Sequence, residues 1–193
     1  MPRTGTLELQ LTAHRRQAWV CTAGLIGFAV LTAIGAQIRV PLPFSPVPVT
    51  LQTLVVLLAG VTLGRRAAAA SMALYVTAGA CGLPIFSGWS AFLTGATAGY
   101  LLAFPLAAWI AGAMSERKSV ASTAAGLGLA TLAIWICGAA WLTLMIEQPI
   151  TTVLMAAVVP FIAGDLMKAA AVLSVARMAR GSYERAADGQ HRD

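Results

Sequence analysis

The longest charge-free stretch of the sequence places the strongest constraint on the fold. The 49 residues between Arg66 and Glu116 contain no Asp, Glu, Lys or Arg. A membrane-crossing helix needs about 20 mostly apolar residues to span roughly 30 Å of hydrocarbon, so this stretch is too long for one helix. The glycines and the proline of CGLPIFSGWS, in its middle, favour a break. We therefore expect two membrane helices here, Ala68–Ala80 and Thr94–Met114.

The composition excludes an ordinary soluble domain. Of 193 residues, 59% are hydrophobic and 10% charged, against about 45–50% and 25% in soluble domains. A chain this short cannot bury so much apolar surface internally. The cysteines lie singly in apolar stretches, which favours packing and predicts neither a disulfide nor a metal site: Cys21, Cys81 and Cys137.

Four further apolar segments complete the predicted membrane domain. The first is Ala18–Ile38, and the second, about Val49–Gly64, follows the segment PLPFSPVP. Four prolines in eight residues exclude a regular helix, so this segment is expected to be non-helical and partly at membrane depth. The last two are Ala121–Met145 and Thr151–Arg177. The predicted fold class is all-α: a polytopic membrane protein with a bundle of six transmembrane helices.

The basic residues predict the orientation. Eleven of the 13 lie at the termini or in the second and fourth connections, on one side of a six-helix topology: Arg3, Arg15, Arg16, Arg65, Arg66, Arg117, Lys118, Arg177, Arg180, Arg185 and Arg192. The positive-inside rule then places both termini in the cytoplasm. We expect a cytoplasmic segment at 1–17, the membrane domain at 18–177 and a cytoplasmic tail at 178–193, disordered from Gly181 onwards.

Two ionisable residues lie inside the last apolar segment. Asp165 and Lys168 are three residues apart, which puts both on one helix face, and each costs about 2.5–3.5 kcal/mol at the bilayer centre on insertion scales. One interpretation is a structural ion pair. The other is a polar ligand site, which Pro160 and Gly164 favour because they loosen the helix or open space beside it.

Uncharged polar and aromatic residues gather near the predicted outer ends of the helices. Gln37 and Gln52 fit interhelical hydrogen bonds, although Gln52 could also face a ligand. The outer connections carry aromatic residues that could be interfacial anchors or the cover of a pocket above the Asp/Lys pair: Phe44, Phe86, Trp89 and Phe92.

A stripe of small residues and several absent motifs narrow the function. Ala29 and Ala33 fit either packing within the bundle or docking of a partner membrane protein. The sequence has no GxxxxGK[ST] phosphate loop and no HExxH motif. Both histidines, His14 and His191, lie outside the helices, which argues against a membrane Ser–His protease.

Four segments together resemble the BioY family, the biotin-specific substrate-capture (S) components of energy-coupling factor (ECF) transporters. They are IRVPLPFSPVPVTLQTLVVLLAGVTLG (38–64), LYVTAGACGLPIF ending at Phe86, GATAGYL (95–101) and PFIAGDLMK (160–168). The resemblance implies a six-helix S-component fold in the cytoplasmic membrane that binds biotin from the outer side, with no cofactor and no catalytic activity. It also implies that Asp165 and Lys168 belong to the binding site. The other residues that we expect to bind the substrate are Trp89, Phe86, Gln52, Tyr100 and Phe44.

The resemblance also implies partners. A transmembrane T subunit with two ATPase subunits would supply energy, and the Ala29/Ala33 stripe would dock on it. A homo-oligomer is the other arrangement, and no nucleic-acid partner is expected. The chain has Gly95-Ala-Thr-Ala-Gly-Tyr100 where the family commonly reads Gly-Pro-Thr-Gly-Gly-Tyr, and residues 87–91 lack the Asn or Arg of some relatives. Backbone amides of the 95–100 loop are therefore candidates to bind the biotin carboxylate.

Two other classes remain open from the residues alone. A membrane enzyme would use Asp165 as a base and Lys168 as an acid, and would turn its substrate over. A structural membrane subunit would use the pair only to hold helices together.

Overall fold

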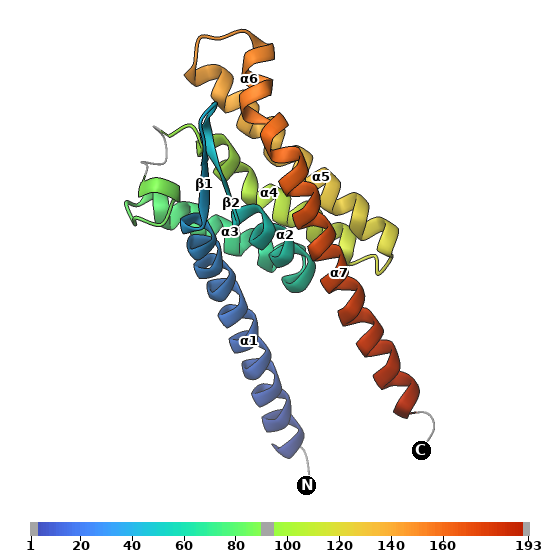
Figure 1. The fold of residues 1–193 in the computed structure, drawn as a ribbon. Coiled ribbons are helices and arrows are strands. Elements are labelled where there is room, and N and C mark those ends of the chain that lie inside the picture. The colour runs from blue at the N-terminus through green and yellow to red at the C-terminus, as the bar shows by residue number, and fades with distance from the viewer. Residues whose placement is uncertain (1–3, 90–94, 191–193) are drawn as a thin grey trace.

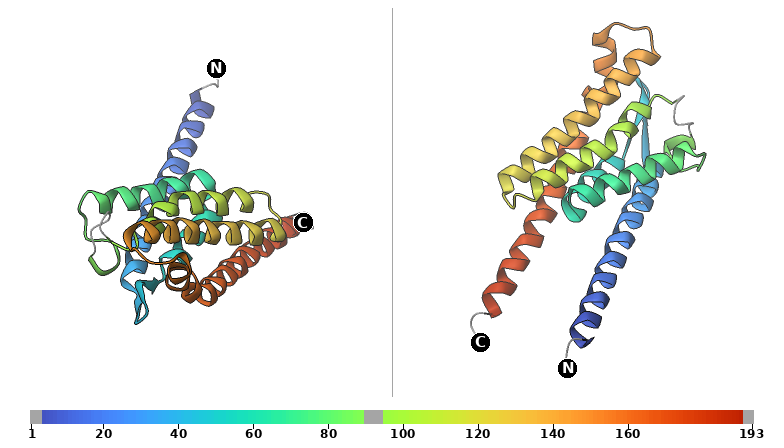
Figure 2. Two further views of the ribbon diagram at one scale, coloured as in Figure 1. Left: turned by 90° about the horizontal axis from the view of Figure 1, so that it is seen from above. Right: turned by 180° about the vertical axis from the view of Figure 1, so that it is seen from behind.

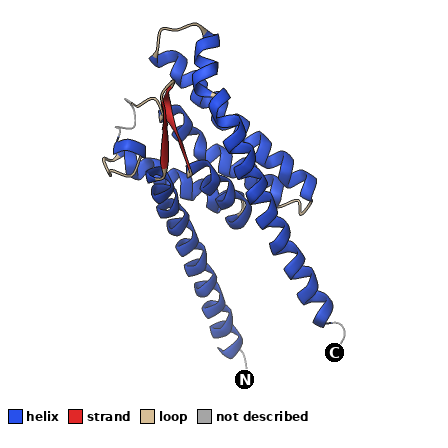
Figure 3. Ribbon diagram, viewed as in Figure 1, coloured by secondary structure: helices blue, strands red, loops and turns tan. Residues whose placement is uncertain are grey.

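The computed structural model describes the backbone of residues 4–89 and 95–190 and the side chains of residues 19–88 and 95–181. The described chain is mostly helical, with one hairpin and one short 3-10 helix (Figures 1 and 3). The elements are α1 (Thr4–Gln37), β1 (Arg39–Leu42), β2 (Ser45–Thr50), α2 (Gln52–Leu63), α3 (Arg65–Ala80), η1 (Ser87–Trp89), α4 (Ala98–Ser115), α5 (Val120–Met145), α6 (Ile150–Ala157) and α7 (Val159–Gln190).

Within the described residues, four helical segments are long and apolar enough to cross a membrane: Trp19–Gln37, Ala98–Ser115, Val120–Met145 and Ile150–Gly181. The apolar helix α2 is shorter, at 12 residues. The break predicted at CGLPIFSGWS is confirmed, because α3 ends at Ala80 and α4 begins only at Ala98. The protein therefore has the architecture of a helical membrane protein.

Helix α4 is the centre of the bundle and packs against α2, α3 and α5. Its buried face consists largely of small residues such as Ala108, Ala111 and Gly112, which allow neighbouring helices to approach closely. Gly60 of α2 uses this space: a Cβ atom there would lie 2.7 Å from the Ala108 carbonyl oxygen. One wall of the cavity described below is therefore built on a tightly packed α2–α4 pair.

The proline-rich segment forms the antiparallel hairpin β1–β2, with Arg39 opposite Thr50 and Leu42 opposite Ser45. The predicted absence of helix is confirmed, but the hairpin itself was not expected. Proline is tolerated in edge strands because only one side of such a strand needs paired N–H groups, and both strands here are edges. Strand β2 contacts α6, and the hairpin lies at the end of the molecule that carries α6 (Figure 1).

The last predicted helix is divided, which corrects the continuous span Thr151–Arg177. Helix α6 ends at Ala157, Val158 is non-helical (φ −126°, ψ −55°), and α7 begins at Val159. Pro160 has no N–H for the Ala156 carbonyl, and the Phe161 N–H bonds to Val158 rather than Ala157. Two side chains replace these bonds: Ser45 Oγ donates to the Ala156 oxygen (2.8 Å) and Tyr100 Oη to the Ala157 oxygen (2.6 Å).

The two ends of the described chain lie at the same end of the molecule, where α1 and α7 extend beyond the other helices (Figures 1 and 2). Helix α1 begins at Thr4, so the predicted start at Ala18 is wrong for the helix itself, and His14 lies within α1 rather than outside the helices. The predicted disorder from Gly181 onwards is wrong for the described backbone, because α7 continues to Gln190. The Ala, Arg and Glu residues of this tail have high helix propensity.

Candidate functional site

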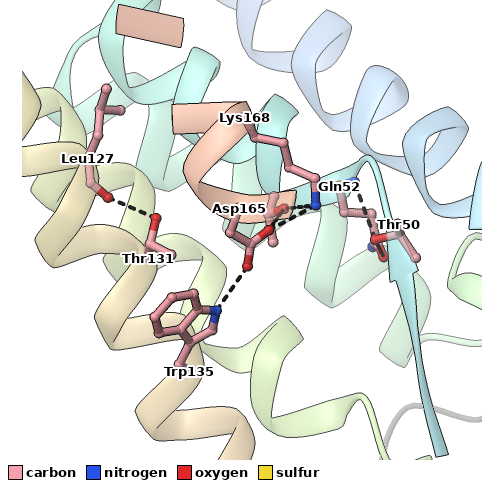
Figure 4. Close-up of polar contacts among 8 residues, drawn as sticks. Thr50, Gln52, Leu127, Thr131, Trp135, Asp165 and Lys168 are labelled. Carbon is pink, nitrogen blue, oxygen red and sulfur yellow. Dashed lines mark hydrogen bonds and ion pairs between the residues drawn. The ribbon is translucent and has the colours of Figure 1, made fainter. Parts of the chain in front are cut away.

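Asp165 and Lys168 of α7 form a buried ion pair. The Lys168 ammonium donates to Asp165 Oδ1 at 2.9 Å, and their side chains are 11% and 4% exposed. The i, i+3 spacing brings them together on one face, as the sequence predicted. Because α7 begins after the break at Val158, this face is directed toward α2 and α5 (Figure 4).

Two further residues, which the sequence analysis missed, complete the polar cluster. Thr53 of α2 donates to Asp165 Oδ1 (3.1 Å) and accepts from Lys168 Nζ (2.8 Å). Trp135 of α5 donates its indole N–H to Asp165 Oδ2 (2.9 Å; Figure 4). A threonine and a tryptophan are ordinary residues in membrane helices, so neither carries a sequence signal without its partner.

A narrow cavity of about 40 Å³ lies beside this cluster. Its polar lining comes from Asp165, Lys168 and four further side chains, and its apolar lining from the hairpin and three helices. The lining residues are Val47, Pro48, Thr50, Gln52, Thr53, Thr97, Tyr100, Leu101, Phe104, Ile134, Trp135, Phe161, Asp165 and Lys168. An apolar cavity with a few convergent polar groups is the usual form of a small-molecule site.

Gln52 lines the cavity, but its amide has protein partners. Its Oε1 accepts from Thr50 Oγ1 (3.1 Å), and its Nε2 donates to the Tyr75 hydroxyl (2.7 Å), which in turn donates to the Ile85 carbonyl. Gln52 therefore connects the end of the hairpin to α3. Gln37, in contrast, is exposed.

Tyr100 lines the cavity with its ring, while its hydroxyl bonds to Ala157. The ring lies 6.0 Å from that of Phe161, centroid to centroid, at 54°. The two aromatic rings form an apolar wall that would suit a flat, weakly polar ring system.

The structure does not place the other predicted aromatic residues on this cavity. Phe44 is 64% exposed at the turn of the hairpin and lines a separate surface hollow together with Met155 and Pro160. Phe86 is buried in the core, with its ring edge-on to Tyr75 at 5.4 Å. The Trp89 side chain and the whole of Phe92 lie outside the described residues.

The small-residue stripe of α1 is at least partly used for internal packing. Ala29 is 8% exposed and belongs to the core, and Ala33 packs against that core while remaining partly accessible. The apolar side chains that α1 exposes are larger ones, such as Val30 and Ile34. Of the two interpretations of this stripe, packing within the bundle accounts for Ala29.

The cluster offers both a hydrogen-bond acceptor and a cationic donor in an apolar surrounding. This combination suits a compact polar group that has N–H and C=O functions side by side. Among the described residues, no group of three His, Cys, Asp or Glu side chains could hold a metal ion.

Known proteins match nearly the whole chain. The BioY family model matches residues 11–185. The probable biotin transporter BioY of Pyrococcus horikoshii is 37% identical over 158 residues, covering 80% of this chain and 93% of its own. The biotin transporter BioY of Thermotoga maritima is 36% identical over 167 residues, covering 82% and 95%.

One solved structure has a similar fold. It is the crystal structure of the S-component for biotin from an ECF-type ABC transporter, with a TM-score of 0.75. The match covers 86% of this chain and 93% of that one at 24% sequence identity. The helical arrangement described above is thus shared with an ECF S-component.

Proposed function

The chain belongs to the BioY family, and from that premise we propose that it is a biotin transporter whose binding site is the cavity beside Asp165 and Lys168. Biotin transport is the activity named for its relatives. The observation that carries the site assignment is the buried Asp165–Lys168 pair at an apolar cavity. Charged residues at membrane depth are functional by default because they are costly there.

The chemistry of biotin fits this cavity. Its ureido ring has N–H donors for the Asp165 carboxylate and a carbonyl acceptor for the Lys168 ammonium. Its apolar bicycle would pack against Tyr100 and Phe161, which line the same cavity. The biotin carboxylate would then point toward the loop that precedes α4, where Thr97 lines the cavity.

Binding requires the cavity to widen. Its volume of about 40 Å³ is well below the roughly 300–1,000 Å³ of typical ligand pockets. One wall consists of Val47 and Pro48 of the hairpin, which the Ser45 hydroxyl connects to α6. Movement of the hairpin would open the site toward the end of the molecule at which the hairpin lies.

We further propose six membrane segments: α1, α2 with the adjoining hairpin, α3, α4, α5, and α6 with α7. This topology is supported by the shared end of the two termini (Figure 2) and places both in the cytoplasm, in accordance with the bias of Lys and Arg. The hairpin and the α5–α6 connection would then face outward in the cytoplasmic membrane. Two variants, each with a single cysteine, test this topology with a membrane-impermeant thiol reagent added outside intact cells. The cysteine of Glu147→Cys should react, and the cysteine of Arg117→Cys should not.

The partners follow from the same family assignment. The chain has no phosphate-binding loop for ATP, so a transmembrane T subunit and two ATPases of an ECF module would supply the energy. Co-purification of tagged chain with such subunits tests this. Recovery of the chain alone as a homo-oligomer that still transports biotin would contradict it.

The decisive experiment measures equilibrium binding of labelled biotin to the purified chain in detergent. Asp165→Asn and Lys168→Ala should each weaken binding at least tenfold, because a hydrogen bond to a charged group contributes about 1.5–3 kcal/mol. Glu147→Gln, at an exposed carboxylate outside the site, is the matched control and should bind as the parent does. A folded parent chain that retains no biotin would overturn the proposal.

The same samples separate transport from the other two classes. An enzyme would release chemically altered biotin, which mass spectrometry of the recovered ligand detects. A structural ion pair would make Asp165→Asn unfold more easily without any effect of biotin on the parent. Uptake of labelled biotin by cells that express the chain completes the test.

A further inference from the structure

The Lys168 ammonium has three N–H donors, and two of them have protein acceptors. One donates to Asp165 Oδ1 at 2.9 Å and one to Thr53 Oγ1 at 2.8 Å. The third has no acceptor among the side chains that the structure describes. Since Lys168 lines the cavity, one donor remains for a ligand.

The Asp165 carboxylate likewise has most of its acceptor positions occupied by protein donors. Each of its oxygens accepts about two hydrogen bonds. Oδ1 receives both Thr53 and Lys168, while Oδ2 receives only the Trp135 indole within the described part of the chain. One acceptor position therefore remains, and it is on Oδ2.

Thr53 determines this division. Its hydroxyl has a single hydrogen, so a hydroxyl that donates to Asp165 receives its other bond from Lys168. The direction of donation is therefore fixed: ammonium to hydroxyl to carboxylate. Without the hydroxyl, Lys168 would have a second free donor, and the Asp165 carboxylate would have a second free acceptor position, on Oδ1.

We propose that Thr53 and Trp135 leave the Asp165–Lys168 pair with one free acceptor and one free donor, so that the site recognises a single N–H/C=O edge of a cyclic urea. This rests on the proposed biotin site and specifies which part of the ureido ring is recognised there. A cyclic urea has two such edges that share one carbonyl. The second ring N–H then makes no bond to the pair.

The first test uses the parent protein and isosteric ligands. In two biotin analogues, one ureido N–H or the other is replaced by a ring oxygen, which gives two isomeric cyclic carbamates. One isomer should compete with labelled biotin at least tenfold better than the other, since only one loses a hydrogen bond to a charged group. Equal competition by the two isomers would overturn the inference.

A third ligand tests the donor. Protonated 2-iminobiotin has N–H groups in place of the carbonyl acceptor. Its N–H group would meet the free Lys168 N–H donor without forming a hydrogen bond, so it should compete with labelled biotin at least tenfold less well than unlabelled biotin does. Competition equal to that of biotin would also overturn the inference.

The second test changes the positioning residue. Thr53→Val keeps the shape but removes the hydroxyl, and it should bring the affinities of the two carbamate isomers closer to equality; Thr53→Ser should restore the difference. Thr131→Val is the matched control, because the partner of the buried Thr131 hydroxyl within the described residues is the Leu127 carbonyl of its own helix (Figure 4). A merely structural Thr53 would lower stability and leave the isomer ratio unchanged.

The two levels of the proposal fail differently. If the parent binds biotin but binds the two carbamate isomers equally well, the recognition of a single edge is wrong, whereas the biotin site stands. If the folded parent binds no biotin, the site assignment itself is wrong.

Discussion

The Tyr100 hydroxyl donates a 2.6 Å hydrogen bond to the carbonyl of Ala157, the last residue of α6. This bond crosses from the central helix to the break that separates α6 from α7. It satisfies a carbonyl that the broken helix leaves without its usual partner. A residue that lines the ligand cavity thus also supports the break from which Asp165 is positioned.

Removing this hydroxyl should therefore affect stability as well as binding. In Tyr100→Phe the buried Ala157 carbonyl loses its partner, which costs about 1–3 kcal/mol. We expect a lower thermal midpoint in detergent and weaker biotin binding. Ser174→Ala is the control and should leave both quantities unchanged, because the exposed Ser174 hydroxyl donates to the Ala170 carbonyl of its own helix.

Gly60 should not tolerate even one added methyl group. In Gly60→Ala the new Cβ would approach the Ala108 oxygen and the Ala111 Cβ, each at 2.7 Å. Overpacking of this kind costs roughly 1–3 kcal/mol, measurable by thermal unfolding. Gly128→Ala, where a Cβ has no neighbour within 4 Å, should be neutral or slightly stabilising; equal loss in both variants would contradict the close α2–α4 contact.

The positions of Phe161 and Phe44 predict different effects of their substitution on biotin affinity. Phe161→Leu removes part of the cavity wall and should weaken binding by about 1–2 kcal/mol, roughly 5–30-fold. Phe44→Leu, at the exposed turn of the hairpin, should leave the equilibrium affinity within about twofold. A large loss from Phe44→Leu would mean that the turn folds over the ligand.

Arg180 should determine how firmly the end of α7 is attached. Its Nη2 donates to Thr123 Oγ1 (2.8 Å) and to the Ser115 carbonyl (3.2 Å), which joins α7 to the α4–α5 connection. Arg180→Ala should speed amide hydrogen exchange in residues 175–190, because the attachment is lost. Arg177→Ala, at an exposed position, should not; similar exchange in both variants would contradict the attachment.

The ion pair could be predicted because its two members lie on one helix. Asp165 and Lys168 are three residues apart, and periodicity alone places them together. Thr53 and Trp135 could not be found in this way, since they lie 112 and 30 residues from Asp165. Their roles depend on the packing of three helices.

The fold was predictable to a similar extent. Apolar length and charge gave most of the helix positions, and Pro160 indicated a weak point in the last one. The site of the break could not be derived from Pro160 alone, because the freed carbonyls needed Ser45 and Tyr100 from distant elements. Likewise, four prolines exclude a helix, but they do not determine that the chain pairs as a hairpin.

The opposite charges of Asp165 and Lys168 have an electrical consequence. A transmembrane voltage does work of about 2.3 kcal/mol on each elementary charge per 100 mV. The pair sums to zero, so the voltage does no net work on it when this part of α7 changes its depth in the membrane. If biotin binds as proposed, its carboxylate is the charge at this site on which the voltage acts.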